Sequence, residues 1–173
     1  MKKTILILIS FAFLLCFACR SHDFDRKKFE NVNCAAQAVR ASLKAGANLQ
    51  QFGDLLKKLS SEIAILNRRV ESDREKELLK HYSTLLAIYR DGFTLWKYNM
   101  EFTRYGFVPK ARIYVGEDVE PIAEKYRLET DSHAFKSTRQ VWRSIPEHSI
   151  QIIWINADSQ MEIINNILRA NNS

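Results

Sequence analysis

The residues best suited to bind a ligand gather in one short stretch beyond residue 100. Basic and aromatic side chains alternate there, in the order Arg104, Tyr105, Lys110, Arg112 and Tyr114. Guanidinium and ammonium groups attract anions, and aromatic rings provide a flat apolar surface for stacking. The same side chains can instead lie along a helical bundle with only their charged ends in water. Because the stretch has no fixed spacing, it favours surface packing, and a small pocket for an anionic ligand is the alternative.

Residues for metal binding or catalysis show no recognisable spacing. The histidines, which are His22, His81, His133 and His148, have no partner at the separations used by zinc or haem sites. P-loop, dinucleotide-binding, H-E-x-x-H and G-x-S-x-G patterns do not occur. A Ser–His–Asp triad stays open, because its members need not be close in sequence. We expect no metal and no cofactor, and an enzyme on an undescribed helical scaffold remains an alternative.

The beginning of the chain has the organisation of a secretion signal. Lys2 and Lys3 precede an apolar run, residues 4–18, whose 15 residues are fewer than the about 20 that a spanning helix needs. The run ends in Ala18-Cys19, which resembles the lipobox of bacterial lipoproteins. The resemblance covers residues 1–19 only. It implies that residues 1–18 are removed as a signal peptide and that Cys19 is lipidated and becomes the mature N-terminus.

The resemblance also implies a location in the bacterial cell envelope. Arg20, which follows the cysteine, suggests the outer membrane, with the protein facing the periplasm. The alternative is ordinary secretion after Ala18, because Cys16 and Ala18 offer small residues at both recognition positions. A free Cys19 could then form a disulfide with Cys34 in an oxidising compartment. If Cys19 carries lipid, Cys34 is a lone thiol, and its Ala-rich helical surroundings predict that it is buried and inert.

A long central helix is the element around which the rest of the chain is organised. Apolar residues recur at alternating steps of three and four between Arg74 and Arg104, which is the period of a helix. They are Leu79, Tyr82, Leu86, Tyr89, Phe93, Trp96 and Met100. The stripe predicts a core, with Trp96 buried in it. Gly92 interrupts the helix, which indicates either the close approach of another helix or a kink.

Two helices should precede the central one. An Ala-rich segment, Asn33–Ala45, favours the first helix, and Gly46 is suited to end it. Asn48 with Gln51 has the pattern of a capping box, so a second helix should begin near Leu49. Ser72 with Glu75 repeats that pattern and predicts a short turn, which makes the second and central helices antiparallel neighbours. The charged residues around this turn, Glu75 among them, are expected to form a solvated surface.

The remaining chain is expected to be mostly helical. Tyr105–Gly116 is the least helical segment, and Ile113-Tyr114-Val115 favours extended structure. Helices are expected over Glu117–Tyr126 and Ser132–Ser144. Ser144 with Glu147 has a third capping-box pattern, which predicts a last helix that reaches about Ala170. Its core line is Ile150, Ile153, Ala157, Met161, Ile164 and Leu168.

Together these patterns predict an all-α protein, a bundle of about five to six helices with a long central helix and an antiparallel helical hairpin. Its parts would be a signal peptide (1–18), a tether (19–30) and a helical domain (31–173). The function that fits best is a non-enzymatic envelope lipoprotein, anchored to the membrane at Cys19, that binds an envelope protein partner or has a structural role. The alternative is a secreted or tethered domain that binds a small anionic ligand in a pocket near Gly92. The net charge of +6 fits ordinary solubility, so we expect no nucleic-acid partner.

Overall fold

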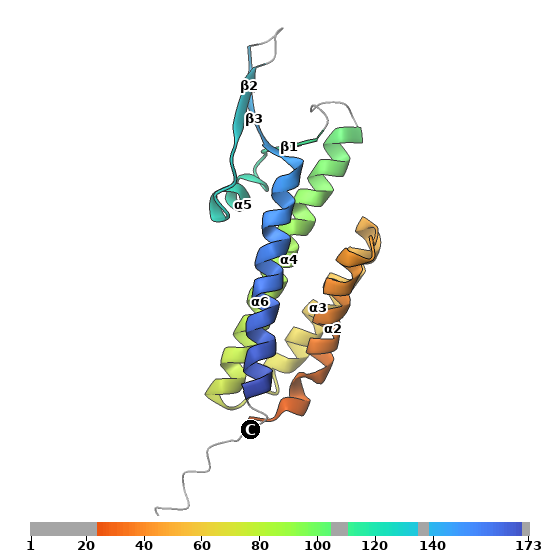
Figure 1. Ribbon diagram of the computed structural model, residues 1–173, viewed down its shortest axis with the longest axis vertical. Coiled ribbons are helices and arrows are strands. Elements are labelled where there is room, and N and C mark those ends of the chain that lie inside the picture. Colours follow the sequence, from red (N-terminus) through yellow and green to blue (C-terminus); the bar gives the residue numbers. More distant parts are fainter. Residues whose placement is uncertain (1–23, 105–110, 135–138, 171–173) are drawn as a thin grey trace, which may run out of the picture.

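The computed structural model describes residues 24–104, 111–134 and 139–170. This part of the chain is mostly helical and carries a small three-stranded sheet (Figure 1). The predicted signal peptide, Cys19, Tyr105 and Lys110 lie outside the described residues.

Four long helices form the body of the molecule. They are α2 (Glu30–Lys44), α3 (Leu49–Asn67), α4 (Asp73–Arg104) and α6 (Ile150–Ala170), and a short 3-10 helix, η1 (Arg26–Phe29), precedes them. Helix α4 packs against both α3 and α6, and α2 packs against α3. The predicted antiparallel hairpin is present, because Phe52 stacks on Phe93 and Ser60 accepts a hydrogen bond from Arg90. Helix α6 also runs antiparallel to α4.

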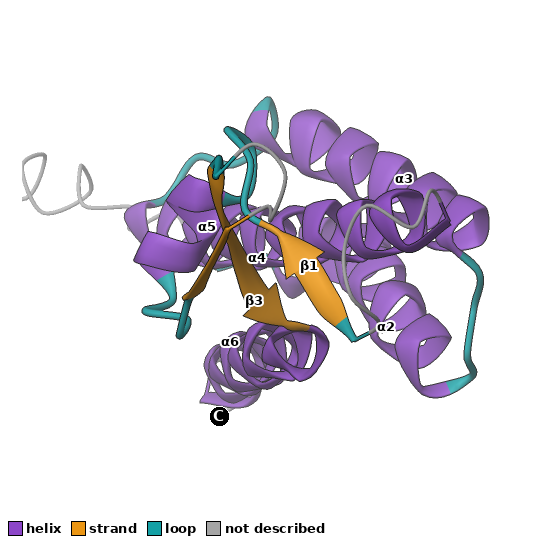
Figure 2. Ribbon diagram, turned by 90° about the horizontal axis from the view of Figure 1, so that it is seen from above, coloured by secondary structure: helices purple, strands orange, loops and turns teal. Residues whose placement is uncertain are grey.

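The sheet is inserted between α4 and α6 and lies across one end of the bundle (Figure 2). Its strands are β1 (Arg112–Tyr114), β2 (Asp131–Ala134) and β3 (Val141–Pro146), and all pairs are antiparallel in the order β1-β3-β2. A short helix, α5 (Glu120–Lys125), follows β1, and a 3-10 turn, η2 (Glu147–Ser149), leads from β3 into α6. Polar bonds fasten this part to α4, from Tyr98 to Asp118 at 2.6 Å and from Tyr126 to Asp91 at 2.8 Å.

Several predicted features are confirmed. The capping box of Asn48 and Gln51 has both of its hydrogen bonds, and so does that of Ser72 and Glu75. Helix α6 ends at Ala170, and every residue of its predicted core line is buried. Gly92 marks a close approach rather than a kink, because a Cβ atom there would lie 2.2 Å from the ring of Trp154 in α6. His81 contacts Gln160 of α6 at 2.9 Å and is partly exposed.

The predicted helix over Ser132–Ser144 is wrong. Strands β2 and β3 occupy the described parts of this segment, and Ile145 of β3 is buried opposite Ile113 of β1. The apolar spacing of the segment fits a short helix, but pairing with β1 buries the β-branched residues better. Ser144 lies in β3 and caps no helix, since α6 begins only at Ile150. The protein is therefore mostly helical with a small sheet, rather than all-α.

Three predictions about burial are also wrong. Cys34 is exposed, because the buried face of α2 contains Val32, Ala35, Ala36 and Val39, and Cys34 points the other way. Glu75 is fully buried rather than solvated. Trp96 is only partly buried and Met100 is 51% exposed, since the central stripe leaves the core near the sheet.

Candidate functional site

A cleft with a volume of about 610 Å³ opens where the bundle meets the sheet. Four parts of the chain contribute to it: the end of α2 with the turn that leads to α3, the last turns of α4, the residue before β1, and the segment from η2 into α6. The lining residues are Leu43, Gly46, Ala47, Trp96, Asn99, Ala111, Glu147, His148, Ile150, Gln151 and Trp154. It lies beside Ala111, close to the position near Gly92 where the sequence predicted a pocket.

Two tryptophans form the aromatic walls of this cleft. Trp96 and Trp154 are partly buried, and the fully buried Phe52 packs against both, with ring centroids 5.8 and 5.7 Å away. Trp154 fits because the residue facing it in α4 is Gly92, whose missing side chain leaves room for the indole. The two walls therefore have little freedom to move.

The polar rim of the cleft is fixed to the sheet. Asn99 donates a hydrogen bond to Glu147 at 2.8 Å, and the backbone N–H of Glu147 donates to the carbonyl of Ala111 at 2.9 Å. His148 and Gln151 complete the rim and are exposed. Among the described residues that line the cleft, none is Lys or Arg. The rim therefore offers neutral amides, a carboxylate and an imidazole.

A second chamber, with a volume of about 260 Å³, adjoins the cleft and shares Leu43, Gln151 and Trp154 with it. It lies between α2, α4 and α6 and contains the ion pair of Arg40 with Asp158, 2.7 Å apart. We call the cleft the outer chamber and this space the inner chamber.

Tyr89 lines the inner chamber with an unused hydroxyl group. Its side chain is 1% exposed, and its oxygen has no hydrogen-bond partner within the described residues. Burial raises the pKa of Tyr89, and the charge of Asp158 raises it further, so the phenol stays protonated. Buried polar groups in proteins nearly always have a partner, and one without a partner needs an explanation. A ligand that enters the chamber would supply the missing bond.

Of the predicted ligand residues, the structure describes the side chains of Arg112 and Tyr114, and neither is among the described residues that line the cleft. Arg104 ends α4, and its side chain is not among those described, whereas Tyr105 and Lys110 lie outside the described residues altogether. Arg112 and Tyr114 do share one face of the sheet. Arg112 donates to Ser144 at 2.9 Å and pairs with Asp131, and Tyr114 stacks on Trp142. The prediction of a ligand site at these five residues therefore stays a prediction.

The same face of the sheet contains a serine–histidine contact. His133 Nε2 lies 2.9 Å from Ser144 Oγ, which is the separation of a nucleophile and its base. However, Ser144 is fully buried, its oxygen accepts a hydrogen bond from Arg112, and Asp131 pairs with Arg112. These bonds join β1, β2 and β3 to one another and already use the serine oxygen, so we assign the contact a structural role.

A larger groove, about 970 Å³, runs between α3 and α4. Leu49, Gly53, Leu56, Ala64 and Phe93 contribute its apolar surface. The charges on its rim are already paired, Lys57 with Asp54 at 2.9 Å and Lys97 with Glu101 at 3.8 Å. Groups satisfied in this way have less to offer a ligand than the rim of the outer chamber.

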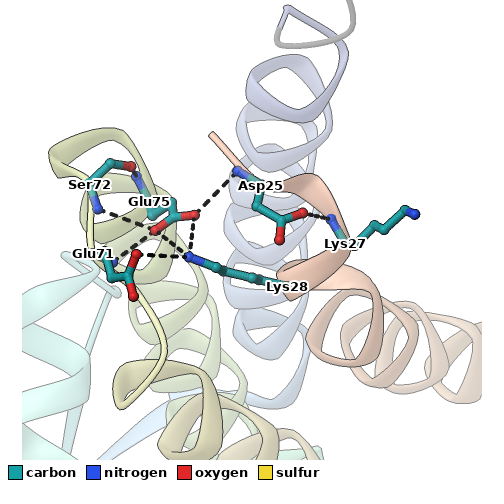
Figure 3. A network of polar contacts seen from close by, with 6 residues as sticks. All are labelled: Asp25, Lys27, Lys28, Glu71, Ser72 and Glu75. Carbon is teal, nitrogen blue, oxygen red and sulfur yellow. Dashed lines mark hydrogen bonds and ion pairs between the residues drawn. The ribbon is translucent and has the colours of Figure 1, made fainter. Parts of the chain in front are cut away.

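At the opposite end of the bundle, Glu75 holds the N-terminal segment in place (Figure 3). Its carboxylate accepts hydrogen bonds from the backbone amides of Asp25, Glu71 and Ser72 and from the ammonium group of Lys28. Burial alone would raise the pKa of Glu75, but these bonds outweigh burial and lower the pKa to about 2. Phe24 stacks on the buried Phe29 beside it. Part of the predicted tether is therefore bound to the bundle.

Two further features of the described residues limit the chemistry. No three His, Cys, Asp or Glu side chains in this part of the chain are arranged to hold a metal ion. Within the same residues, we find no helix whose length and hydrophobicity would let it cross a membrane.

Comparison with known proteins adds no relative: no protein-family model, curated protein or solved structure matches this chain. The function must therefore be inferred from the geometry of the molecule itself. Trp96 belongs to a helical stripe that predicts core packing, and Trp154 lies outside the predicted core line of the last helix, so the spacing of neither residue indicated a site. A glycine facing a tryptophan was the only signal available, and it required knowing that α4 and α6 are neighbours.

Proposed function

We propose that this protein is a lipid-anchored binding module of the bacterial cell envelope and that its ligand binds in the outer and inner chambers. The observation that carries the proposal is the buried, unpartnered hydroxyl of Tyr89 beside a cleft with fixed aromatic walls. Ligand sites combine an apolar concave surface with a few polar groups that converge on it, and this is the arrangement found here.

The position of the predicted anchor supports the same proposal. If Cys19 carries the lipid, the backbone from Cys19 to Phe24 spans at most about 18 Å, because a chain advances about 3.3–3.6 Å per residue. The contacts of Glu75 then keep the base of the bundle close to the membrane. Glu75 and Trp96 are 21 residues apart in one helix, which corresponds to about 32 Å. The cleft would open well away from the lipid surface, toward material in the periplasm.

The anchor is tested by mass spectrometry of the N-terminus of protein purified from membranes. We expect a lipidated Cys19 at the N-terminus, and we expect Cys19→Ala to move the protein into the soluble fraction. An unmodified N-terminus, or a Cys19→Ala variant that stays in the membrane fraction, would rule out the anchor.

Binding through the cleft is tested with purified envelope fractions and with proteins that all carry Cys19→Ala, because the lipid itself would retain the lipidated form. We expect Trp96→Leu to lower the amount of protein retained by envelopes at least several-fold, because one wall of the outer chamber is lost. Met100→Leu is the matched control, since Met100 lies one turn further along α4 and is exposed. Equal retention of the wild type and Trp96→Leu would refute the assignment of the site.

A second candidate is the tethered or secreted domain for an anionic ligand. Lys44 and Arg40 line the inner chamber and are the observation that favours it. Arg40 is already paired with Asp158, and the described lining of the outer chamber contains no cation. The geometry therefore supports an uncharged ligand better.

A further inference from the structure

We infer that the ligand is a chain of sugar rings, with one ring against the indoles of the outer chamber and the next ring reaching the hydroxyl of Tyr89 in the inner chamber. This inference rests on the proposed function and names the class of ligand for the same site.

The walls of the outer chamber match the face of a sugar ring. A pyranose presents a face of C–H bonds, which carry a small positive charge, while its hydroxyl groups point outward from the rim. The face of an indole ring is negative and apolar, so C–H groups pack against it favourably. Trp96 and Trp154 provide two such surfaces, and Phe52 beneath them holds both. A flexible wall would lose more entropy when the ring binds.

The polar rim matches hydroxyl groups better than it matches charged ones. A hydroxyl both donates and accepts hydrogen bonds, and the side-chain amides of Asn99 and Gln151 do the same. Glu147 adds an acceptor, held in place by Asn99 and by the backbone of Ala111. A phosphate or carboxylate ligand would instead need the cations that the described lining of the outer chamber lacks.

The shape of the site favours an oligomer over a single compact molecule. Leu43, Gln151 and Trp154 border both chambers, so a ligand that occupies both has to pass between these side chains. The hydroxyl group of Tyr89 borders the inner chamber, and it can donate and accept hydrogen bonds that no described residue makes with it. A second ring linked to the first would bring a hydroxyl group into that space.

The test is titration of the purified full-length mature protein with a soluble tetrasaccharide of β-1,4-linked N-acetylglucosamine, followed by tryptophan fluorescence and calorimetry. We expect saturable binding that Tyr89→Phe weakens about 10-fold, which is the effect of one hydrogen bond to a buried group. Tyr82→Phe is the matched control: Tyr82 is equally buried in α4, but its hydroxyl already bonds to Asn33. That substitution should leave the affinity unchanged.

A second pair of variants tests the place where the chambers meet. Gln151→Ala should weaken the tetrasaccharide several-fold, whereas Asn166→Ala, an exposed amide further along α6, should have no effect. The monosaccharide N-acetylglucosamine should bind more weakly than the tetrasaccharide. Because one ring fills only the outer chamber, Tyr89→Phe should not alter the affinity of the monosaccharide.

Two results would overturn the inference. One is equal affinity of the wild type and Tyr89→Phe for the tetrasaccharide. The other is that none of three tetrasaccharides binds saturably: this one and the tetramers of β-1,4- and α-1,4-linked glucose. Binding of adenosine, which is not a chain of sugar rings, would not rescue the inference in that case. If Trp96→Leu still lowers retention by envelopes, the proposed function stands and only the class of ligand is wrong. If Trp96→Leu has no effect on retention, the proposed function itself fails.

Discussion

Two buried polar groups on the same helix have opposite surroundings. Glu75 and Tyr89 lie fourteen residues apart in α4, about 21 Å along its axis. The carboxylate of Glu75 accepts four hydrogen bonds, whereas the hydroxyl of Tyr89 has no partner within the described residues. Burial of a polar group is costly unless its bonds are satisfied. The first group therefore stabilises the fold, and the second lacks the hydrogen bonds that would compensate for its burial.

The neighbourhoods of the two groups differ in the same way. Around Glu75, three backbone amides and Lys28 converge from the turn before α4 and from the N-terminal segment (Figure 3). Around Tyr89, the helices α2 and α6 leave the inner chamber open. Departures from local consistency in a folded chain concentrate at functional sites. On this basis we propose that the base of the bundle holds the N-terminal segment and that its other end holds the ligand site.

The largest effect should come from removing the satisfied group. Glu75→Ala leaves the amides of Asp25, Glu71 and Ser72 and the ammonium of Lys28 without their acceptor. We expect a loss of about 3–5 kcal/mol in the free energy of unfolding, as for other broken buried ion pairs, out of about 5–15 kcal/mol for a typical domain.

Urea unfolding followed by circular dichroism measures this loss. The control is Glu77→Ala, a change of the same residue type at an exposed position in the same part of α4, which should stay within about 0.5 kcal/mol of the parent. A difference of less than 1 kcal/mol between the two variants, relative to the roughly 0.5 kcal/mol scatter of surface changes, would contradict a structural role for Glu75.

Gly92→Ala should have the next largest effect, and it acts near the two chambers rather than near Glu75. Its Cβ would lie 2.2 Å from two ring atoms of Trp154, so the indole has to move away from α4. We expect a loss of about 2–3 kcal/mol, the upper range for overpacking, together with a changed near-ultraviolet signal from the tryptophans.

Gly53→Ala is the matched control for that change. A Cβ at Gly53 would meet Phe93 at 3.2 Å, which a small shift relieves, and alanine favours the helix by about 1 kcal/mol. This variant should be neutral or slightly stabilised. Equal melting temperatures for the two alanine variants would show that the close contact of Trp154 with α4 is absent.

The helices were predictable because their periodic patterns are long. The stripe in α6 runs over five turns, and each of its residues is buried as expected. The strands were not predictable in the same way, since Ser132–Ser144 is short and its spacing fits a helix as well as it fits a strand. What decides the outcome is the distant partner, because Ile145 is buried opposite Ile113 in the sheet.

The side chains of the candidate site were not predictable from the sequence. Trp96 continues an apolar stripe, and only the geometry at the end of the bundle leaves it partly exposed. The missing partner of Tyr89 depends on the spacing of three helices, which no local pattern contains. Similarly, the burial of Glu75 depends on Asp25 and Lys28, almost fifty residues earlier in the chain.

Acid should weaken the base of the bundle before it affects the site. The pKa of Glu75 is lowered from 4.5 to about 2 in the folded protein, so its ionised form favours folding. The contribution is complete above about pH 4.5 and is lost as the pH falls toward 2, and it amounts to about 1–3 kcal/mol. Urea titrations at pH 6 and pH 3 measure it. Glu75→Gln has no titrating group at this position. If the parent and Glu75→Gln lose the same free energy of unfolding between pH 6 and pH 3, the lowered pKa is not the cause of the loss.

The smallest expected effect is on the stability of the unliganded protein. It compares a buried hydroxyl group that has a hydrogen-bond partner with one that has none. Tyr82 and Tyr89 are both fully buried in α4, but the hydroxyl of Tyr82 donates to Asn33 at 3.2 Å. Tyr82→Phe should therefore cost about 0.5–1.5 kcal/mol, the net worth of a hydrogen bond.

On folding, the hydroxyl group of Tyr89 gives up its hydrogen bonds to water and makes none within the described residues. Tyr89→Phe removes this cost, so the free energy of unfolding should stay constant or rise by about 0.5–1 kcal/mol. Thermal and urea unfolding of both variants without ligand decide the matter. If Tyr89→Phe costs as much as Tyr82→Phe, then its hydroxyl already has a partner in the free protein. The inner chamber would in that case have no unused group with which to hold a ligand.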